Sequence, residues 1–217
     1  MIARSNASAS PTIGIESNGM LMSPDEFDAV GDYNHDYRYE LVHGVLVVNP
    51  IPSLGEVGPN ELLGNLLYAY QQYHEQGKAL DATWPERYIR LSDSRRRADR
   101  VIYVGLGRMP NEDVDLPAIA VEFVSRARRN WIRDYERKRK EYEAVGLKEY
   151  WVIDRFERAM TVYRFQKRKT TETTIHPPEI YATPLLPGFE LKLAQLFDYA
   201  DEVTQANPRP RKRKKKP

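Results

Sequence analysis

The sequence contains no cysteine, and this absence excludes disulfides, thiolate metal sites and cysteine nucleophiles. No apolar run approaches the roughly 20 residues that span a bilayer. There is neither a glycine-rich phosphate loop nor a Gly-x-Ser-x-Gly nucleophile elbow, and the four histidines lack the spacing of a metal-binding motif. We therefore expect a cytoplasmic protein with no membrane segment and no small-molecule cofactor, whose chemistry depends on carboxylates and basic side chains.

Positive charge is concentrated at one end of the chain. The 217 residues carry 33 Lys and Arg against 31 Asp and Glu, and residues 207–217 hold seven of the basic residues and no acid. The remaining 26 basic and 31 acidic residues give the body a formal charge of −5. The body is therefore not a broadly basic surface. The tail either binds phosphate backbones and other polyanions or only keeps the protein soluble.

The ends differ in composition from the middle of the chain. Residues 1–19 are rich in Ser, Ala, Thr and Asn without hydrophobic periodicity, and we predict them to be disordered. We predict the same for the basic tail, residues 204–217. Residues 20–203 remain as one α/β domain, which is long enough to bury a substantial core.

The expected elements follow hydrophobic periodicity and turn residues. Ser23 is typical of a helix N-cap, because Pro24 and Glu26 follow it in the first turn. His43-Gly44 predicts the turn of a hairpin between residues 37–42 and 45–49. The later elements are a loop over 50–59, a helix over 60–76, strands over 84–91, 101–104, 160–165 and 170–175, a strand over 179–182 on the same edge, and a closing helix over 191–200.

Residues 118–154 are the centre of the predicted fold. A buried strand over 118–124 and another over 150–153 flank a helix over 133–145, which ends at Gly146. At 3.6 residues per turn one face of this helix carries Trp131, Tyr135, Lys138, Tyr142 and Val145, with Lys140 on the opposite face.

A lysine on a core-facing helix face loses hydration unless another group compensates its charge. Glu122, on the strand that the helix covers, is the natural partner for Lys138. Two simpler explanations stay open at this stage, namely a purely structural ion pair and a lysine that extends out to water.

Two further acids occur near predicted strands. Asp99 follows Arg95–Arg97 and precedes the strand over 101–104, so we expect it at the mouth of that strand, where it could also pair with an arginine or cap a turn. Glu40 lies among apolar residues of the first hairpin strand, and it could instead face water.

Asp99, Glu122, Lys138 and Glu40 together suit a hard divalent cation such as Mg²⁺ or Mn²⁺, which takes oxygen ligands. A metal between Asp99 and Glu122 could polarise a phosphodiester and activate water, and Lys138 could orient that water or offset charge on the phosphate. The basic residues expected near the same mouth, as contacts to flanking phosphates, are Arg95, Arg96, Arg97, Arg126, Arg128 and Arg129.

Several motifs in this order resemble one known family. Arg97-Ala98-Asp99 is followed by VEFVS at 121–125, by Asp134-x-x-x-Lys138-x-x-x-Tyr142, and by GLKEYWVID at 146–154. YELVHG at 39–44 and PLLPGF at 184–189 complete the set. Over about residues 22–199 the sequence is similar to the Uma2 family of restriction endonucleases.

The resemblance implies the PD-(D/E)xK nuclease fold, an α/β fold with a mixed sheet flanked by helices and with catalytic acids on adjacent strands. It implies Asp99 and Glu122 as the two acids, with Asp99, Glu122 and Phe123 as the metal site. The lysine expected two residues after Glu122 is replaced by Val124, and Lys138 on the next helix takes its place. Glu40 matches a supporting ligand of the metal or of water. Ala98 stands where the family motif has proline.

The expected function is that of a Mg²⁺-dependent DNA endonuclease, with DNA as partner and a homodimer suited to cutting both strands. An inactive nuclease fold that binds nucleic acid or a protein is the alternative. A plain interaction module is a third possibility, but it leaves an inward Lys138 without a role.

Overall fold

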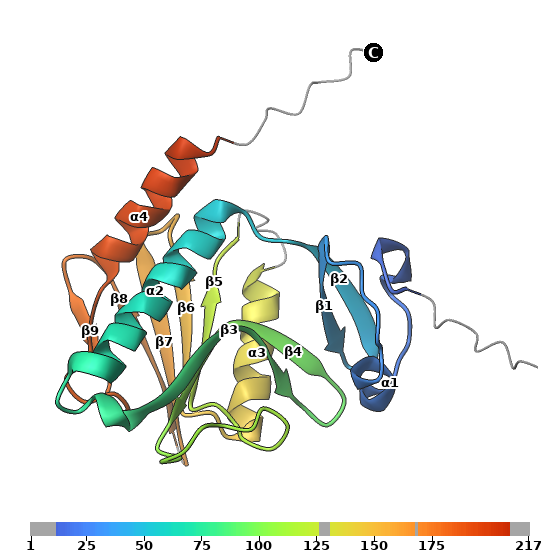
Figure 1. Ribbon diagram of the computed structural model, residues 1–217, viewed down its shortest axis with the longest axis horizontal. Coiled ribbons are helices and arrows are strands. Elements are labelled where there is room, and N and C mark those ends of the chain that lie inside the picture. Colours follow the sequence, from blue (N-terminus) through green and yellow to red (C-terminus); the bar gives the residue numbers. More distant parts are fainter. Residues whose placement is uncertain (1–11, 126–130, 168, 209–217) are drawn as a thin grey trace, which may run out of the picture. The chain divides into compact units, whose positions relative to one another are not determined.

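The computed structural model describes residues 12–125, 131–167 and 169–208, and it divides into two compact units where the sequence predicted one domain. The first unit comprises Met1–Ile51 and Tyr88–Arg97, and the second comprises Pro52–Arg87 and Ala98–Pro217. Two long strands, β3 (Leu80–Arg90) and β4 (Arg95–Val104), contribute residues to both units (Figure 1). Within the described ranges, every helix is too short or too polar to traverse a bilayer.

The first unit confirms the predicted helix start and hairpin. Helix α1 (Pro24–Asp28) begins after Ser23, whose Oγ accepts a hydrogen bond from the Glu26 N–H at 3.2 Å. Strands β1 (Tyr37–Val42) and β2 (Val45–Pro50) pair antiparallel. Positive φ angles of 50° at His43 and 74° at Gly44 form the tight turn between them. A short 3₁₀ helix, η1 (Ile15–Ser17), precedes α1.

The prediction that residues 1–19 are disordered is wrong for residues 12–19. Ile13 is only 6% exposed and joins a cluster with Phe27, Tyr39 and Leu41. Its main chain is also bonded, since its N–H donates to Asp32 O at 3.1 Å and its carbonyl accepts from Tyr39 Oη at 2.9 Å. One buried isoleucine and these bonds order a segment whose composition is otherwise polar. Residues 1–11 lie outside the described part of the chain.

The second unit contains the predicted strand–helix–strand centre. Strand β5 (Ile119–Phe123) pairs parallel with β6 (Glu149–Asp154), and helix α3 (Trp131–Val145) lies between them in the chain. Strands β7 (Ala159–Gln166) and β8 (Lys169–Ile175) extend the sheet antiparallel beyond β6, and β4 pairs antiparallel with β5 on the other side. The predicted mixed sheet is confirmed.

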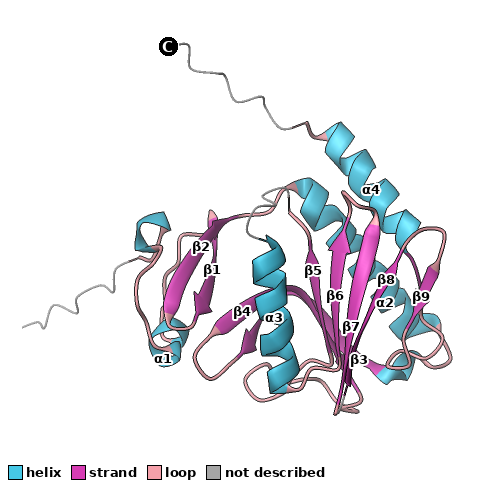
Figure 2. Ribbon diagram, turned by 180° about the vertical axis from the view of Figure 1, so that it is seen from behind, coloured by secondary structure: helices cyan, strands magenta, loops and turns pink. Residues whose placement is uncertain are grey.

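Helices cover both faces of this sheet. Helices α2 (Leu54–Tyr73) and α4 (Leu193–Ala206) lie on one face and α3 lies on the other (Figures 1 and 2). The main core lies beneath α2 and α4, where fully buried Leu63, Leu67 and Phe197 meet Val121 and Trp151 of the strands. This arrangement gives the strands β4 and β5 one face toward α2 and one toward α3.

Several predicted boundaries are wrong. Helix α2 begins at Leu54 and includes Pro59, because Glu56 Oε2 accepts from Ser53 N–H at 2.6 Å and so satisfies the helix start six residues before the predicted one. Strand β9 (Ile180–Ala182) pairs with β10 (Glu190–Lys192) in a separate sheet instead of extending β8. Helix α4 runs to Ala206, into the segment 204–217 that was predicted to be disordered.

Candidate functional site

Asp99 and Glu122 lie on adjacent antiparallel strands of the second unit. Strand β4 begins at Arg95, so Asp99 lies inside the strand and not at its mouth as predicted. The register pairs Arg100 with Val121, and one further step places Asp99 across from Glu122. Residues opposite each other in an antiparallel pair point to the same face of the sheet. Both carboxylates therefore belong to one face.

The pairing of β4 with β5 ends beside the two acids. Its last pair is Arg100 with Val121, and beyond it the Phe123 N–H donates to Asp99 Oδ2 at 2.7 Å. The main-chain carbonyl of Asp99 accepts from Asn60 Nδ2 at 2.8 Å. The main chain of Phe123 therefore holds the Asp99 carboxylate, and the side chain of Asn60 holds the Asp99 backbone.

Lys138 of α3 reaches the Glu122 carboxylate, as the helix periodicity predicted. Nζ lies 2.8 Å from Glu122 Oε1, and the two residues are 4% and 5% exposed. The hydroxyl of Tyr142, one turn later, lies 3.4 Å from the same oxygen. The alternative that Lys138 extends to water is excluded by its burial. Lys140 is exposed, and the side chain of Trp131, predicted on the Lys138 face, lies outside the described residues.

Glu40 is buried in the first unit, and the prediction that it could face water is wrong. It is 8% exposed, its Oε2 lies 3.3 Å from Arg96 Nη1, and its Oε1 accepts from Arg97 N–H at 3.0 Å. Asp99, Glu122 and Lys138 belong to the second unit. A role for Glu40 at the metal site remains a proposal.

The arginines expected to contact phosphate differ in their surroundings. Arg95 is 8% exposed and its Nη2 lies 2.8 Å from Asp28 Oδ2, while Arg96 is 1% exposed and pairs with Glu40. Buried and paired guanidiniums are poorly placed to meet a phosphate, so these two serve the packing of the first unit. Arg97 is half-buried, with Cζ 5.8 Å from the centroid of the Tyr88 ring. The other three, Arg126, Arg128 and Arg129, lie outside the described residues.

The donors around Asp99 and Glu122 fit a hard cation. Across the described ranges no cluster of three or more His, Asp or Glu side chains is placed to hold a metal. Mg²⁺ does not need such a cluster, because one or two carboxylates, several waters and substrate phosphate oxygens complete its shell. The Asp99 and Glu122 carboxylates and the Phe123 carbonyl are all oxygen donors, which match this preference.

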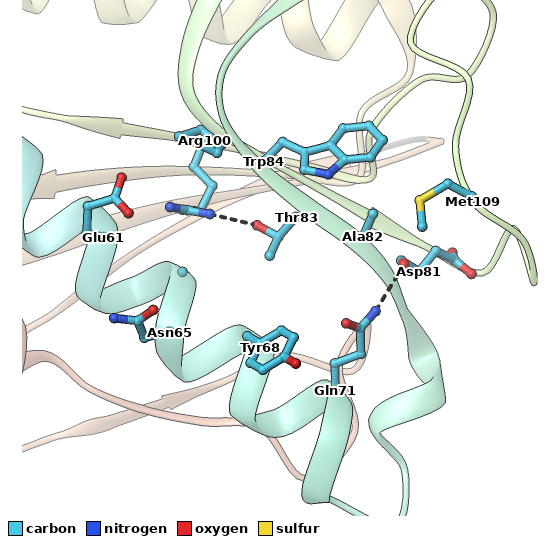
Figure 3. A pocket seen from close by; sticks show the side chains of 12 residues that line it. Glu61, Asn65, Tyr68, Gln71, Asp81, Ala82, Thr83, Trp84, Arg100 and Met109 are labelled. Atoms are coloured by element: carbon cyan, nitrogen blue, oxygen red, sulfur yellow. Dashed lines mark hydrogen bonds between the residues drawn. The ribbon is translucent and has the colours of Figure 1, made fainter.

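A cleft of about 380 Å³ opens on the other face of the sheet, between α2 and β3 (Figure 3). Gly64, Tyr68, Thr83 and Arg100 are among its lining residues. Arg100 follows Asp99 in β4, so the two side chains point to opposite faces. The cleft is therefore separate from the carboxylate site.

A further buried carboxylate, Glu149, was not singled out from the sequence. It is 2% exposed and accepts hydrogen bonds from Trp151 Nε1 at 2.9 Å, Arg164 Nε at 2.8 Å, Tyr181 Oη at 2.7 Å and Thr183 Oγ1 at 2.9 Å. Burial raises the pKa of Tyr181, and the neighbouring Glu149 charge raises it further. Four donors satisfy this carboxylate, which indicates a structural role.

The contact of Asn60 with the candidate site was also not predicted from the sequence. Asn60 was predicted only as the first residue of a helix, yet it is 4% exposed and bonded to the backbone of Asp99. No residue pattern marks a buried amide of this kind, because its partners come from a strand 40 residues away in the chain.

Comparison with known proteins supports a nuclease fold. Among solved structures, the chain is similar to a crystal structure described as a "putative nuclease belonging to DUF820" from Anabaena variabilis, with a TM-score of 0.62 and 14% sequence identity over 82% of this chain and 99% of that chain. No curated protein matches. A family model of Uma2, described as "Putative restriction endonuclease", matches residues 24–194. That match covers most of the sequence and all four proposed site residues, and the chain belongs to the Uma2 family.

Proposed function

We propose that the protein is a Mg²⁺-dependent DNA endonuclease that hydrolyses phosphodiester bonds. The observation that supports this proposal best is the buried contact between Lys138 and Glu122, next to Asp99 on the neighbouring strand. A family of nucleases and a nuclease-like fold are consistent with it. Fold alone does not fix function, so the argument depends on these side chains.

Asp99 and Glu122 would hold the metal, with the main-chain carbonyl of Phe123 as a third oxygen donor. Mg²⁺ or Mn²⁺ bound there supplies Lewis-acid polarisation of the phosphodiester and lowers the pKa of a bound water. Asp99 is already fixed by the Phe123 N–H, and Glu122 by Lys138 and Tyr142. Ligands held in this way need little rearrangement to bind a cation.

Lys138 would supply positive charge beside the reacting phosphate. Its ammonium lies 2.8 Å from a proposed metal ligand and is shielded from solvent, so its charge acts in a medium of low dielectric constant. It can orient the attacking water or offset charge that develops on the phosphate oxygens. Glu40 would support the metal or its water, and Arg97, Arg126, Arg128 and Arg129 would bind flanking phosphates. A homodimer would allow both strands of a duplex to be cut.

The second candidate function is an inactive nuclease fold that binds nucleic acid or a protein partner. The same ion pair is the observation that favours it, because Glu122 and Lys138 compensate each other's charge in a buried position. Buried pairs of this kind also occur as purely structural features.

Lys138→Met separates the two functions. In an enzyme, plasmid nicking with Mg²⁺ should fall by about 10²–10³-fold, because charge stabilisation at the phosphate is lost, while Mn²⁺ still binds. In an inactive fold, the variant loses only stability, by about 3–5 kcal/mol for a buried carboxylate left without its partner. Lys140→Met, on the exposed face of the same helix, is the matched control and should nick at the wild-type rate.

Metal titration of Asp99→Asn and Glu122→Gln tests the ligands directly. Each variant should lose Mn²⁺ affinity by calorimetry while it keeps its fold by circular dichroism. Equal affinity in the wild type and both variants would reject the site, and equal nicking by the wild type and Lys138→Met would reject the proposed role of the lysine.

A further inference from the structure

Asn60 connects helix α2 to the backbone of the proposed metal ligand Asp99. Its Nδ2 donates to Asp99 O at 2.8 Å, and its Oδ1 accepts from Arg100 Nε at 2.8 Å. Its main-chain carbonyl accepts from Arg100 Nη2 at 2.9 Å. The residue is 4% exposed. The amide nitrogen and the amide oxygen of Asn60 are therefore both hydrogen-bonded, the nitrogen to Asp99 and the oxygen to the next residue of β4, Arg100.

Arg100 fixes which way the Asn60 amide points. A guanidinium has only N–H donors, so it must face the amide oxygen, and the amide nitrogen is then directed to the Asp99 carbonyl. Arg100 is itself held by Thr83, with Nη1 3.2 Å from Thr83 Oγ1 (Figure 3). Its guanidinium lies against Gly64, where a Cβ atom would come within 2.6 Å of Nη2.

This arrangement keeps the positive charge of Arg100 buried, away from water. Arg100 is 3% exposed, and burial lowers its pKa to about 10, while the Glu61 charge opposes that shift. In the described part of the chain its three hydrogen bonds all go to uncharged oxygens. A buried cation without a carboxylate partner is costly, and here it orients one amide behind the site.

The position of the Asp99 carboxylate depends on such side-chain contacts because the regular ladder ends next to it. The last pair of β4 with β5 is Arg100 with Val121, and the Phe123 N–H beyond it donates to the Asp99 carboxylate. A shift of the Asp99 backbone would therefore move the carboxylate and break its contact with Phe123.

We propose that Asn60 is a positioning residue for Asp99, and that Arg100 sets the direction of its amide. The consequence for metal affinity and cleavage rests on the proposed nuclease function. The effect on the Asp99 geometry does not, because it follows from the hydrogen bonds alone.

Asn60→Asp separates positioning from packing. The carboxylate keeps an acceptor for Arg100 and adds a charge partner for it, so the fold should persist. It cannot donate, so it places an oxygen against the Asp99 carbonyl and displaces that backbone.

Gln71→Glu is the matched control on the same helix. Gln71 Nε2 donates to Leu80 O at 2.8 Å and Asp81 O at 3.0 Å, so it also connects α2 to strand backbone, away from the carboxylates (Figure 3). The chemical change from amide to acid is the same. A merely structural role predicts similar effects of the two variants.

Two measurements test the proposal. The first is the NMR amide resonance of Phe123, assigned with Asp99→Asn, in protein without metal. It should shift in Asn60→Asp and stay at the wild-type position in Gln71→Glu. The second is Mn²⁺ affinity, which should fall about 10–100-fold in Asn60→Asp and remain unchanged in Gln71→Glu, with similar melting temperatures for the two variants.

The outcomes separate this inference from the proposed function. If wild-type protein neither binds Mn²⁺ nor nicks DNA, the proposed function fails and the Phe123 resonance alone decides the positioning role. An unchanged Phe123 resonance in a folded Asn60→Asp protein overturns the inference. If Asn60→Asp does not fold, Asn60→Ala and its control Gln71→Ala replace the two variants. The Phe123 resonance should again shift only in the Asn60 variant, and an unchanged resonance would again overturn the inference.

Discussion

Asp28 is a partly exposed acid that compensates the charge of the buried Arg95 in the first unit. Its carboxylate accepts from Arg95 Nη2 at 2.8 Å and from Arg90 Nη1 at 2.6 Å. Burial raises the pKa of Asp28, but the hydrogen bonds and positive charges of Arg95 and Arg90 outweigh that effect and bring the pKa below its ordinary value of 3.8. The folded state therefore favours the ionised carboxylate.

A lowered pKa in the folded state has a definite sign for stability. The stabilisation is complete above 3.8, the pKa of the unfolded chain, and is lost as pH falls through the lower folded value. We expect the hydrogen-exchange protection factors of β1 and β2 amides, which are corrected for the intrinsic pH dependence of exchange, to fall below about pH 4. In Asp28→Asn the protection factors should already be lower at neutral pH, because Arg95 keeps a buried charge without its partner. Their acid dependence should shrink.

Asp25→Asn on the same helix is the control, since Asp25 is also an exposed acid but the described ion pairs of Arg90 and Arg95 are with Asp28. It should leave both the protection factors at neutral pH and their acid dependence close to wild type. An acid dependence in Asp28→Asn equal to that of wild type would show that another group is responsible.

For single residues, the sequence predicts the direction of a side chain when that direction follows from the periodicity of one helix. It does not predict the burial of a residue whose partner lies far away in the chain. The inward direction of Lys138 follows from 3.6 residues per turn alone. The burial of Arg95 and Arg96 could not be predicted in this way, because their acids, Asp28 and Glu40, are far away in the chain and only the folded unit brings them together.

Helix α2 shows how a short contact sets the start of an element. Glu56 Oε2 accepts from the Ser53 N–H and from Ser53 Oγ, both at 2.6 Å. These bonds satisfy a donor that the helix start would otherwise leave unpaired. Pro59 lies inside the helix, close to this start. The prediction of a loop over 50–59 was wrong because it treated this proline as a residue that ends or excludes a helix.

Removing this cap should destabilise the second unit. Ser53→Ala and Glu56→Ala should each lower the free energy of unfolding by about 1 kcal/mol, measured by urea denaturation with tryptophan fluorescence. The double variant should lose less than the sum, because the two residues share one contact. Gln72→Ala, exposed on the same helix, should lose nothing, and strictly additive losses would contradict the shared contact.

Short strands are predictable as extended segments but not in their pairing. The strand over 179–182 was expected from its composition, and β9 is found at Ile180–Ala182. Its partner, β10, is only three residues long, and nothing in three residues distinguishes pairing with β10 from pairing with β8. Pairing depends on contacts between distant segments, which local patterns do not contain.

On the scale of the whole molecule, the mixed sheet with helices on both faces was predictable and the division into two units was not. The strand–helix–strand centre fixes parallel pairing of β5 with β6, which the sequence of alternating elements implies. The first unit instead combines two separate stretches, Met1–Ile51 and Tyr88–Arg97, around its own apolar cluster. No change of composition marks those boundaries, since β3 and β4 each continue from one unit into the other.

Charge distribution is the property of the whole chain that most affects an encounter with DNA. Residues 207–217 hold seven positive charges, and the other residues sum to −5. An acidic body repels the phosphate backbone at long range, so the tail should dominate attraction. Each phosphate that a basic side chain neutralises contributes about 0.9 to the slope of log affinity against log salt for duplex DNA.

Deletion of residues 207–217 should therefore weaken DNA binding at low salt and reduce that slope by up to about 6, if all seven basic residues contact phosphates. Fluorescence anisotropy with a labelled duplex across a salt titration measures both. A tail of the same length with its seven Lys and Arg replaced by Gln should behave like the deletion, which separates charge from chain length. Metal-dependent nicking at saturating DNA should survive both changes, because the proposed chemistry lies at Asp99, Glu122 and Lys138. A slope equal to that of the wild type in both variants would show that the phosphate contacts are made by the body despite its net negative charge.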